Sequence, residues 1–153
     1  MRPLTEITDI EKWDSTTRTA MQLLRGARDA LTIPVDRVYI APGDEVAWDP
    51  SCEGQLYVRI VTSTANRPEH CDGPKTVIYG LGVVRCVATV DDQGVPPSPN
   101  RMTQDALVLQ TDRRDLECFL TDAVKTTGIM EWSAMGPEGG AALGEWNFGV
   151  VVL

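Results

Sequence analysis

The sequence predicts an α+β fold: a mixed, mainly antiparallel β-sheet packed with two α-helices. Two segments, 16–31 and 102–124, place apolar residues at helical spacing. Several shorter segments alternate apolar and polar residues, as strands with one covered face do. The segments follow the order helix, three strands, helix, two strands. This grouping favours one sheet with a crossover helix over regularly alternating strands and helices.

Length, composition and charge narrow the class of protein. A chain of 153 residues suits one domain, and we expect residues 14–153 to form it after an N-terminal arm at 1–13. Hydrophobic residues make up 42% and charged residues 24%, which argues against wholesale disorder. The net charge of −8 argues against tight binding to DNA or to an anionic membrane. The arm carries charges where a secretory signal needs an apolar core, so we expect synthesis in a cytosol.

The first helix is predicted over 16–31. Asp14 or Ser15 can cap it, because a short side chain with an oxygen atom accepts a bond from a free N–H group of the first turn. Pro34 ends it, since a proline disfavours helical geometry in the residue before it. One apolar face predicts contact with the sheet, and it consists of Ala20, Leu23, Leu24, Ala27, Ala30 and Leu31.

Three strands are predicted next, over 35–41, 55–63 and 76–90. In the third strand, Gly80 and Gly82 share one face. Glycines leave room for a helix backbone or an aromatic ring, so we interpret them as packing positions and not as a ligand site. Alternation predicts that the core faces of the second and third strands are formed by Leu56, Val58 and Ile60, and by Val77, Tyr79, Leu81 and Val83.

The second half of the chain predicts a loop, a helix and a hairpin. The polar, proline-rich segment 91–100 is expected to be an exposed loop, and the helix is expected to begin near Met102 or Thr103 and end near Val124. Asp112 and Asp115 lie beside arginines on this helix, and we interpret them as solvated charges. The hairpin strands are predicted over 129–135 and 143–153.

The four cysteines, Cys52, Cys71, Cys86 and Cys118, show no CxxC spacing. Cytosolic thiols stay reduced, so free thiols are the expected state, with a Cys52–Cys71 bridge as the alternative in an extracellular particle. A zinc site with Cys52, His70 and Cys71 is disfavoured, because adjacent residues rarely ligate one structural zinc ion. We therefore expect no metal and no cofactor.

The stretch "EWSAMGPEGGAALGEW", residues 131–146, is unusually rich in glycine. A phosphate-binding loop is disfavoured, because a strand and not a helix is predicted to follow and no lysine is near. A tight turn with positive φ angles is the first interpretation, and a docking loop with aromatic anchors is the second. The candidate interface residues are Trp48, Trp132, Gly136, Pro137, Glu138, Gly139, Gly140, Gly144 and Trp146.

Catalytic patterns are weak in this sequence. The single histidine, His70, lies in a polar segment, where histidines are usually solvated. No nucleophile-elbow pattern is present. His70 and Cys71 are adjacent in sequence, so on an extended chain their side chains point apart and form a poor dyad. We expect no catalytic residues.

Four segments together carry a resemblance to a known family: "CEGQLYVRIV", "HCDGP", "VVRCVATVDDQGVPPSP" and "WSAMGPEGGAALGEWNFGVVV". They resemble the small neck proteins of long-tailed actinobacterial phages, the siphophage tail terminator and head-to-tail connector family. The resemblance covers about residues 15–153. Cys52, Cys71, Cys86 and the closing "GPEGG…GEW" carry most of it, and the arm at 1–13 is an addition to the family's pattern.

The resemblance implies a structural virion protein and not an enzyme. A tail terminator forms a hexameric ring that caps the tail tube, stops its growth and joins the head connector. The implied partners are further copies of this chain, the major tail tube protein and the stopper or connector proteins, while DNA passes through the ring without specific binding. The implied location is the virion neck, after assembly in the host cytoplasm. The alternatives are a stopper or adaptor ring and, more remotely, a small hydrolase that uses Cys71 and His70.

Overall fold

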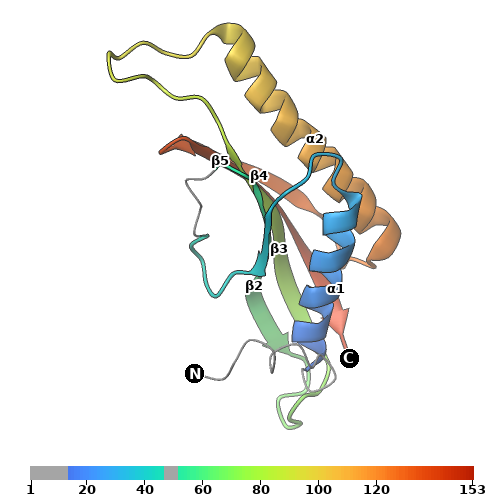
Figure 1. The fold of residues 1–153 in the computed structure, drawn as a ribbon. Helices are drawn as coiled ribbons and strands as arrows, with labels where there is room; N and C mark the ends of the chain where they lie inside the picture. Colours follow the sequence, from blue (N-terminus) through green and yellow to red (C-terminus); the bar gives the residue numbers. More distant parts are fainter. Residues whose placement is uncertain (1–13, 47–51) are drawn as a thin grey trace.

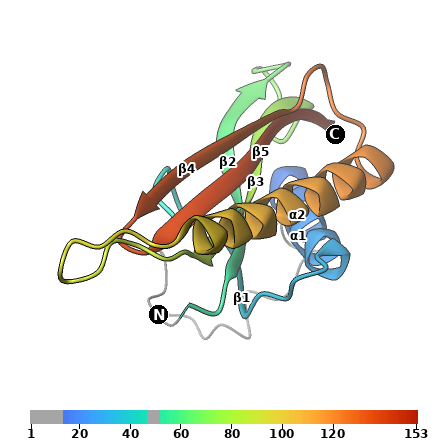
Figure 2. The same cartoon turned by 90° about the horizontal axis from the view of Figure 1, so that it is seen from above.

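The computed structural model describes residues 14–46 and 52–153, and it confirms the predicted α+β class. Within these ranges the strands form one sheet in the order β1-β2-β3-β5-β4. β1 pairs with β2 in parallel, and the other neighbours are antiparallel. Both helices lie on the same side of this twisted sheet (Figures 1 and 2). The strands are β1 Arg37–Ile40, β2 Gln55–Ala65, β3 Lys75–Cys86, β4 Glu131–Glu138 and β5 Ala141–Val152.

The first helix, α1, spans Ser15–Ala30 and confirms the prediction. Asp14 is its N-cap, and the Asp14 carboxylate accepts a bond from the Thr17 backbone N–H at 2.9 Å. This bond lowers the pKa of Asp14. The side chains that face the sheet are those expected from helical spacing, with Ala20, Leu23, Leu24 and Ala27 all buried.

The main core lies between the sheet and the two helices. Alternation predicted the core face of β3 correctly, and that of β2 at Leu56 and Val58. The prediction for Ile60 was wrong: Ile60 is 39% exposed, and the β2–β3 register shifts directly after it. The buried cluster draws on five elements and includes Leu23, Leu24, Leu56, Val58, Val77, Tyr79, Leu81, Val83, Leu116, Leu120, Trp146 and Phe148.

The second helix, α2, spans Pro99–Ala123 and begins earlier than predicted. Ser98 is the N-cap and accepts a bond from the Arg101 N–H, while Pro99 occupies the first turn, where a missing N–H costs nothing. β3 is shorter than predicted and ends at Cys86. The chain then leaves the sheet, and Figure 1 shows the 87–98 segment and the start of α2 extending beyond it.

The prediction that Asp112 is a solvated charge was wrong. Asp112 is fully buried, and its two carboxylate oxygens accept bonds of 2.8 Å each from the Arg85 guanidinium. Arg85 also donates to the backbone oxygens of Ile33 and Pro34. Burial raises the pKa of Asp112, and the bonds from Arg85 oppose this shift. The neighbouring Asp115 accepts a bond from the Thr32 N–H, so it too has a partner.

The cysteines also differ from expectation, because Cys52 forms a disulfide with Cys86, with a Cα–Cα distance of 5.1 Å. The sheet register explains this pairing. Gln55 lies opposite Val84, so the residues just before β2 meet the end of β3. Cys71, the partner considered from the sequence, is a free and exposed thiol in the connection between β2 and β3. Cys118 is also free and exposed. Free thiols were the expected state of Cys71 and Cys118.

Candidate functional site

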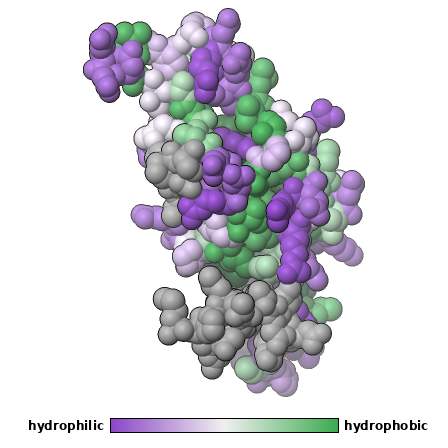
Figure 3. Space-filling model, in the orientation of Figure 1, coloured by the Kyte–Doolittle hydropathy of each residue, from purple (hydrophilic) through white to green (hydrophobic). Residues whose placement is uncertain are grey.

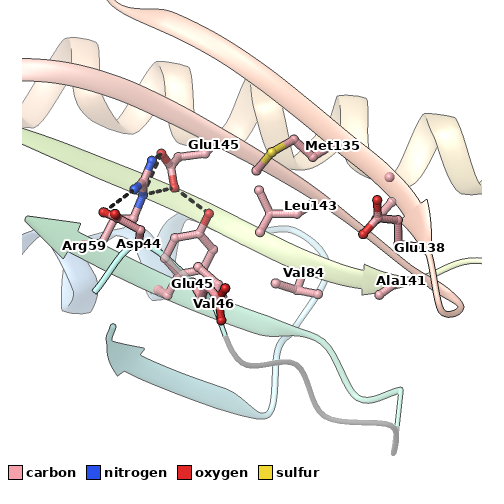
Figure 4. A pocket seen from close by; sticks show the side chains of 13 residues that line it. Asp44, Glu45, Val46, Arg59, Val84, Met135, Glu138, Ala141, Leu143 and Glu145 are labelled. Atoms are coloured by element: carbon pink, nitrogen blue, oxygen red, sulfur yellow. Dashed lines mark hydrogen bonds and ion pairs between the residues drawn. The ribbon is translucent and has the colours of Figure 1, made fainter. Parts of the chain in front are cut away.

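The face of the sheet that points away from the helices carries a pocket of about 600 Å³. Strand alternation places Tyr57 and Arg59 of β2, Val84 of β3, and Leu143 and Glu145 of β5 on this face. The segment after β1 reaches over it, so that Asp44, Glu45 and Val46 form one wall. Met135, Gly136 and Glu138 of β4 form the opposite wall (Figure 4). We call this the open-face pocket.

A charged network occupies one end of the open-face pocket. The Arg59 guanidinium donates to both oxygens of Glu145, at 2.7 to 3.0 Å, and the Tyr57 hydroxyl donates to Glu145 at 2.6 Å. Arg59 also lies 3.8 Å from Asp44, which is almost fully exposed. The dashed lines in Figure 4 mark these contacts. Glu145 is 3% exposed, so its charge depends on these partners for compensation.

The pKa shifts of Tyr57 and Arg59 make these two groups unsuited to proton transfer at neutral pH. Burial, reinforced by the bond to Glu145, raises the pKa of the Tyr57 hydroxyl far above its usual range. The bond to Glu145 also raises the pKa of the Arg59 guanidinium. Tyr57 therefore stays protonated and Arg59 stays charged at neutral pH. A group that cannot change its protonation state near neutrality is a poor general acid or base.

The two glycines of β3 make this network fit. A Cβ at Gly82 would overlap the Tyr57 ring, and a Cβ at Gly80 would lie 2.6 Å from the Glu145 carboxyl group. The prediction that an aromatic ring approaches one of these glycines is thus confirmed. The carboxylate against Gly80 was not predicted.

The glycine-rich stretch forms the turn of the β4–β5 hairpin, as the first interpretation held. Gly139 and Gly140 connect the strands with φ angles of 55° and 80°, the conformation that a two-residue type I′ turn requires at both positions. Gly136, Pro137, Glu138 and Gly139 are exposed, and Gly140 is half-buried. Gly136 and Glu138 also line the open-face pocket, so this tip belongs to the same surface.

The remaining candidate interface residues lie outside the hairpin turn. Trp146 is only 7% exposed on the helix side, and its indole N–H donates to the Arg113 backbone oxygen at 2.9 Å. Trp132 is half-buried, packs on Trp146 with ring centroids 5.6 Å apart, and covers Gly144. Both rings therefore pack against other residues of the same chain. Trp48 lies outside the described residues.

Sequence reasoning did not single out Tyr57, Arg59 or Glu145. Alternation in "QLYVRIVTS" does place Tyr57 and Arg59 together on the face opposite Leu56 and Val58. A charged residue inside an otherwise apolar strand, such as Glu145, is a further signal, because burying a charge requires a partner. The partner itself depends on the β3–β5 and β2–β3 registers, which the sequence does not show.

His70 and Cys71 lie in the exposed connection between β2 and β3, and neither lines the open-face pocket. Across residues 14–46 and 52–153, no group of three or more His, Cys, Asp or Glu side chains is placed to hold a metal ion. Neither helix in those ranges combines the length and apolar character that a bilayer crossing requires.

Comparison with known proteins adds no assignment to this geometry. No protein-family model matches the sequence, and no curated protein matches it significantly. The fold and the open-face pocket therefore define the class in structural terms: an α+β protein whose sheet has one face covered by helices and one face with a charged pocket.

Proposed function

We propose that this chain is a structural subunit of a phage neck, a tail terminator that assembles into a ring, caps the tail tube and joins it to the head connector. The observation that carries the proposal is the open-face pocket, which combines apolar side chains with charged ones and in which the Tyr57 hydroxyl and the Arg59 guanidinium do not titrate near neutral pH. We interpret this pocket as a contact surface for another protein. The resemblance in the four quoted segments supplies the identity of the assembly.

The projecting end of the molecule supports the same role. Val90, Val95, Met102 and Leu107 are each about half exposed or more, and all lie between the end of β3 and the first half of α2. Apolar side chains exposed along a projecting segment can supply contacts to another protein. A ring subunit needs two such contact regions, because each copy has two neighbours.

Electron microscopy of particles made without this chain tests the proposal. A terminator stops tube growth, so its loss yields overlong tails without heads. A stopper or adaptor ring instead holds the genome in the head, so its loss yields leaking heads and tails of normal length. Normal particles in the absence of the chain would refute both roles.

A matched variant addresses the remote hydrolase alternative. Cys71 is exposed and free, so Cys71→Ser leaves the fold intact. We expect particles with this variant to assemble at the wild-type yield, measured as infectious titre against the same strain with the wild-type chain. A loss of titre with normal folding would assign Cys71 a chemical role.

A further inference from the structure

We propose that the outer face of α1 in one copy binds in the open-face pocket of the next copy, with its arginines against the pocket's carboxylates. The inference rests on the proposed ring and specifies which two surfaces build it. It follows from three features of the described residues: a basic helix face, an acidic pocket with an apolar floor, and the position of these two surfaces on opposite sides of the sheet.

The outer face of α1 is basic in an otherwise acidic chain. Helix α1 contains Arg18, Arg25 and Arg28 and one acidic residue, Asp29, and together with its N-cap Asp14 it carries 3 − 2 = +1, whereas the whole chain has −8. All three arginines are exposed, and at 100° per residue Arg18 and Arg25 lie opposite the buried stripe. Within residues 14–46 and 52–153 no ion pair involves them. Figure 3 shows hydrophilic side chains over α1 beside a band of hydrophobic surface.

The open-face pocket has the complementary charge. It is lined by Asp44, Glu45, Glu138 and Glu145 and by one cation, Arg59, so its charge is 1 − 4 = −3. Arg59 is already engaged by Glu145 and Asp44. Glu45 and Glu138 are therefore the carboxylates available to a ligand from outside, and both are exposed.

The pocket also suits the shape of an arginine side chain. Met135, which is 59% exposed, lies next to Leu143 on the floor, because the two residues are register partners in the β4–β5 hairpin. An arginine stem packs on such apolar surface while its guanidinium binds carboxylates at the rim. A carboxylate partner would meet repulsion from the same rim, and a purely apolar partner would leave Glu45 and Glu138 without compensation.

The two surfaces lie on opposite faces of the sheet, and this fixes the kind of assembly. A head-to-tail contact between unlike surfaces leaves one α1 face and one pocket free at the two ends of the assembly, so association continues until a ring closes or, where the rotation between copies does not close, as an open filament. A symmetric contact would stop at the dimer. Each copy then makes two such contacts, one through its α1 face and one through its pocket, which is the number that a ring subunit makes.

Two double variants test the contact by sedimentation at low ionic strength. Arg18→Glu/Arg25→Glu alters only the α1 face, and Glu45→Lys/Glu138→Lys alters only the pocket. We expect the wild type to form species larger than a dimer, and each variant alone to associate at least tenfold more weakly. Mixing the two variants is expected to restore association, because each contact in an alternating assembly then joins opposite charges.

The control is Arg67→Glu/Arg114→Glu, the same charge change as in the α1 variant at exposed positions that belong neither to α1 nor to the pocket lining, and we expect wild-type association. A further variant, Arg18→Gln/Arg25→Gln, removes the two charges without reversing them. The unfolding midpoint of every variant is measured as well, so that loss of the contact can be distinguished from loss of the fold. A wild type that stays monomeric at every concentration would overturn the proposal, as would a mixture that fails to re-associate. If both variants associate as strongly as the wild type, the ring proposal stands but this contact is not part of the ring.

Discussion

Asp14 shows how one side chain sets both a helix boundary and a pH response. Its carboxylate accepts a hydrogen bond from the Thr17 N–H, and this bond holds the pKa of Asp14 below the ordinary value of 3.8. An acid whose pKa is lower in the folded state stabilises that state above its unfolded pKa. The contribution is lost as the pH falls from 3.8 through the folded pKa. The cap therefore matters at neutral pH and fades in acid.

We expect Asp14→Ala to lower the free energy of unfolding by about 1 kcal/mol at neutral pH, and by less as the pH falls through 3.8. Asp14→Asn is the matched control, because asparagine caps helices without a charge, so its stability follows no such titration. Urea denaturation across this pH range measures both variants. An alanine variant with a constant deficit at every pH would contradict the assigned role of the charge.

In the β4–β5 hairpin, Gly144 determines where the Trp132 ring can lie. Gly144 is buried beneath the Trp132 ring, and a Cβ at this position would overlap that ring. Trp132 cannot move outward without leaving Trp146, against which it packs at 5.6 Å. The glycine therefore sets how closely the hairpin lies on the rest of the sheet.

We expect Gly144→Ala to destabilise the protein by about 1–3 kcal/mol and to change the tryptophan fluorescence of the folded state, because overpacking displaces the Trp132 ring. Gly43→Ala is the control, since no heavy atom lies within 4 Å of a Cβ at Gly43. Equal unfolding curves for the two variants would show that the hairpin absorbs the added methyl group freely.

At the scale of helices and strands, periodicity predicted which elements form and most of the faces that they bury, because alternation and helical spacing are local properties. Their bounds were less accurate. α2 begins at Pro99 because Ser98 caps it, although the proline-rich composition there favoured a loop. β3 stops at Cys86, although apolar residues continue beyond it.

The candidate site was predicted only in part, for a related reason. The hairpin turn was visible from Gly139 and Gly140, whose tolerance of positive φ is intrinsic. The Arg59–Glu145 pair, the Arg85–Asp112 pair and the Cys52–Cys86 bridge each join residues at least 27 positions apart. Such partners are decided by strand register and helix placement, which no local pattern in one sequence records.

The Arg85–Asp112 pair connects distant parts of the whole molecule. Arg85 at the end of β3 holds Asp112 on α2 and the two backbone oxygens that precede β1. One guanidinium thus joins the sheet, the second helix and the connection after the first helix. Its removal should be felt in the unfolding of the entire domain and not in one element alone.

We expect Asp112→Asn to lower the free energy of unfolding by about 3–5 kcal/mol, because it leaves the buried Arg85 charge without its partner. The double variant Arg85→Met/Asp112→Leu is expected to recover part of this loss, since it removes both charges together. Thermal and denaturant unfolding measure the two. A single variant within ~0.5 kcal/mol of the wild type would show that the charge finds compensation elsewhere.

The position of β5 has a consequence for synthesis on the ribosome. β5 follows every other strand along the chain, yet it lies between β3 and β4. Until it emerges, β3 presents a bare, hydrophobic edge and β4 has nothing to pair with, which is the condition in which nascent chains aggregate. Translation speed through the last stretch, and any chaperone that shields β3 meanwhile, should therefore govern the yield of properly folded protein.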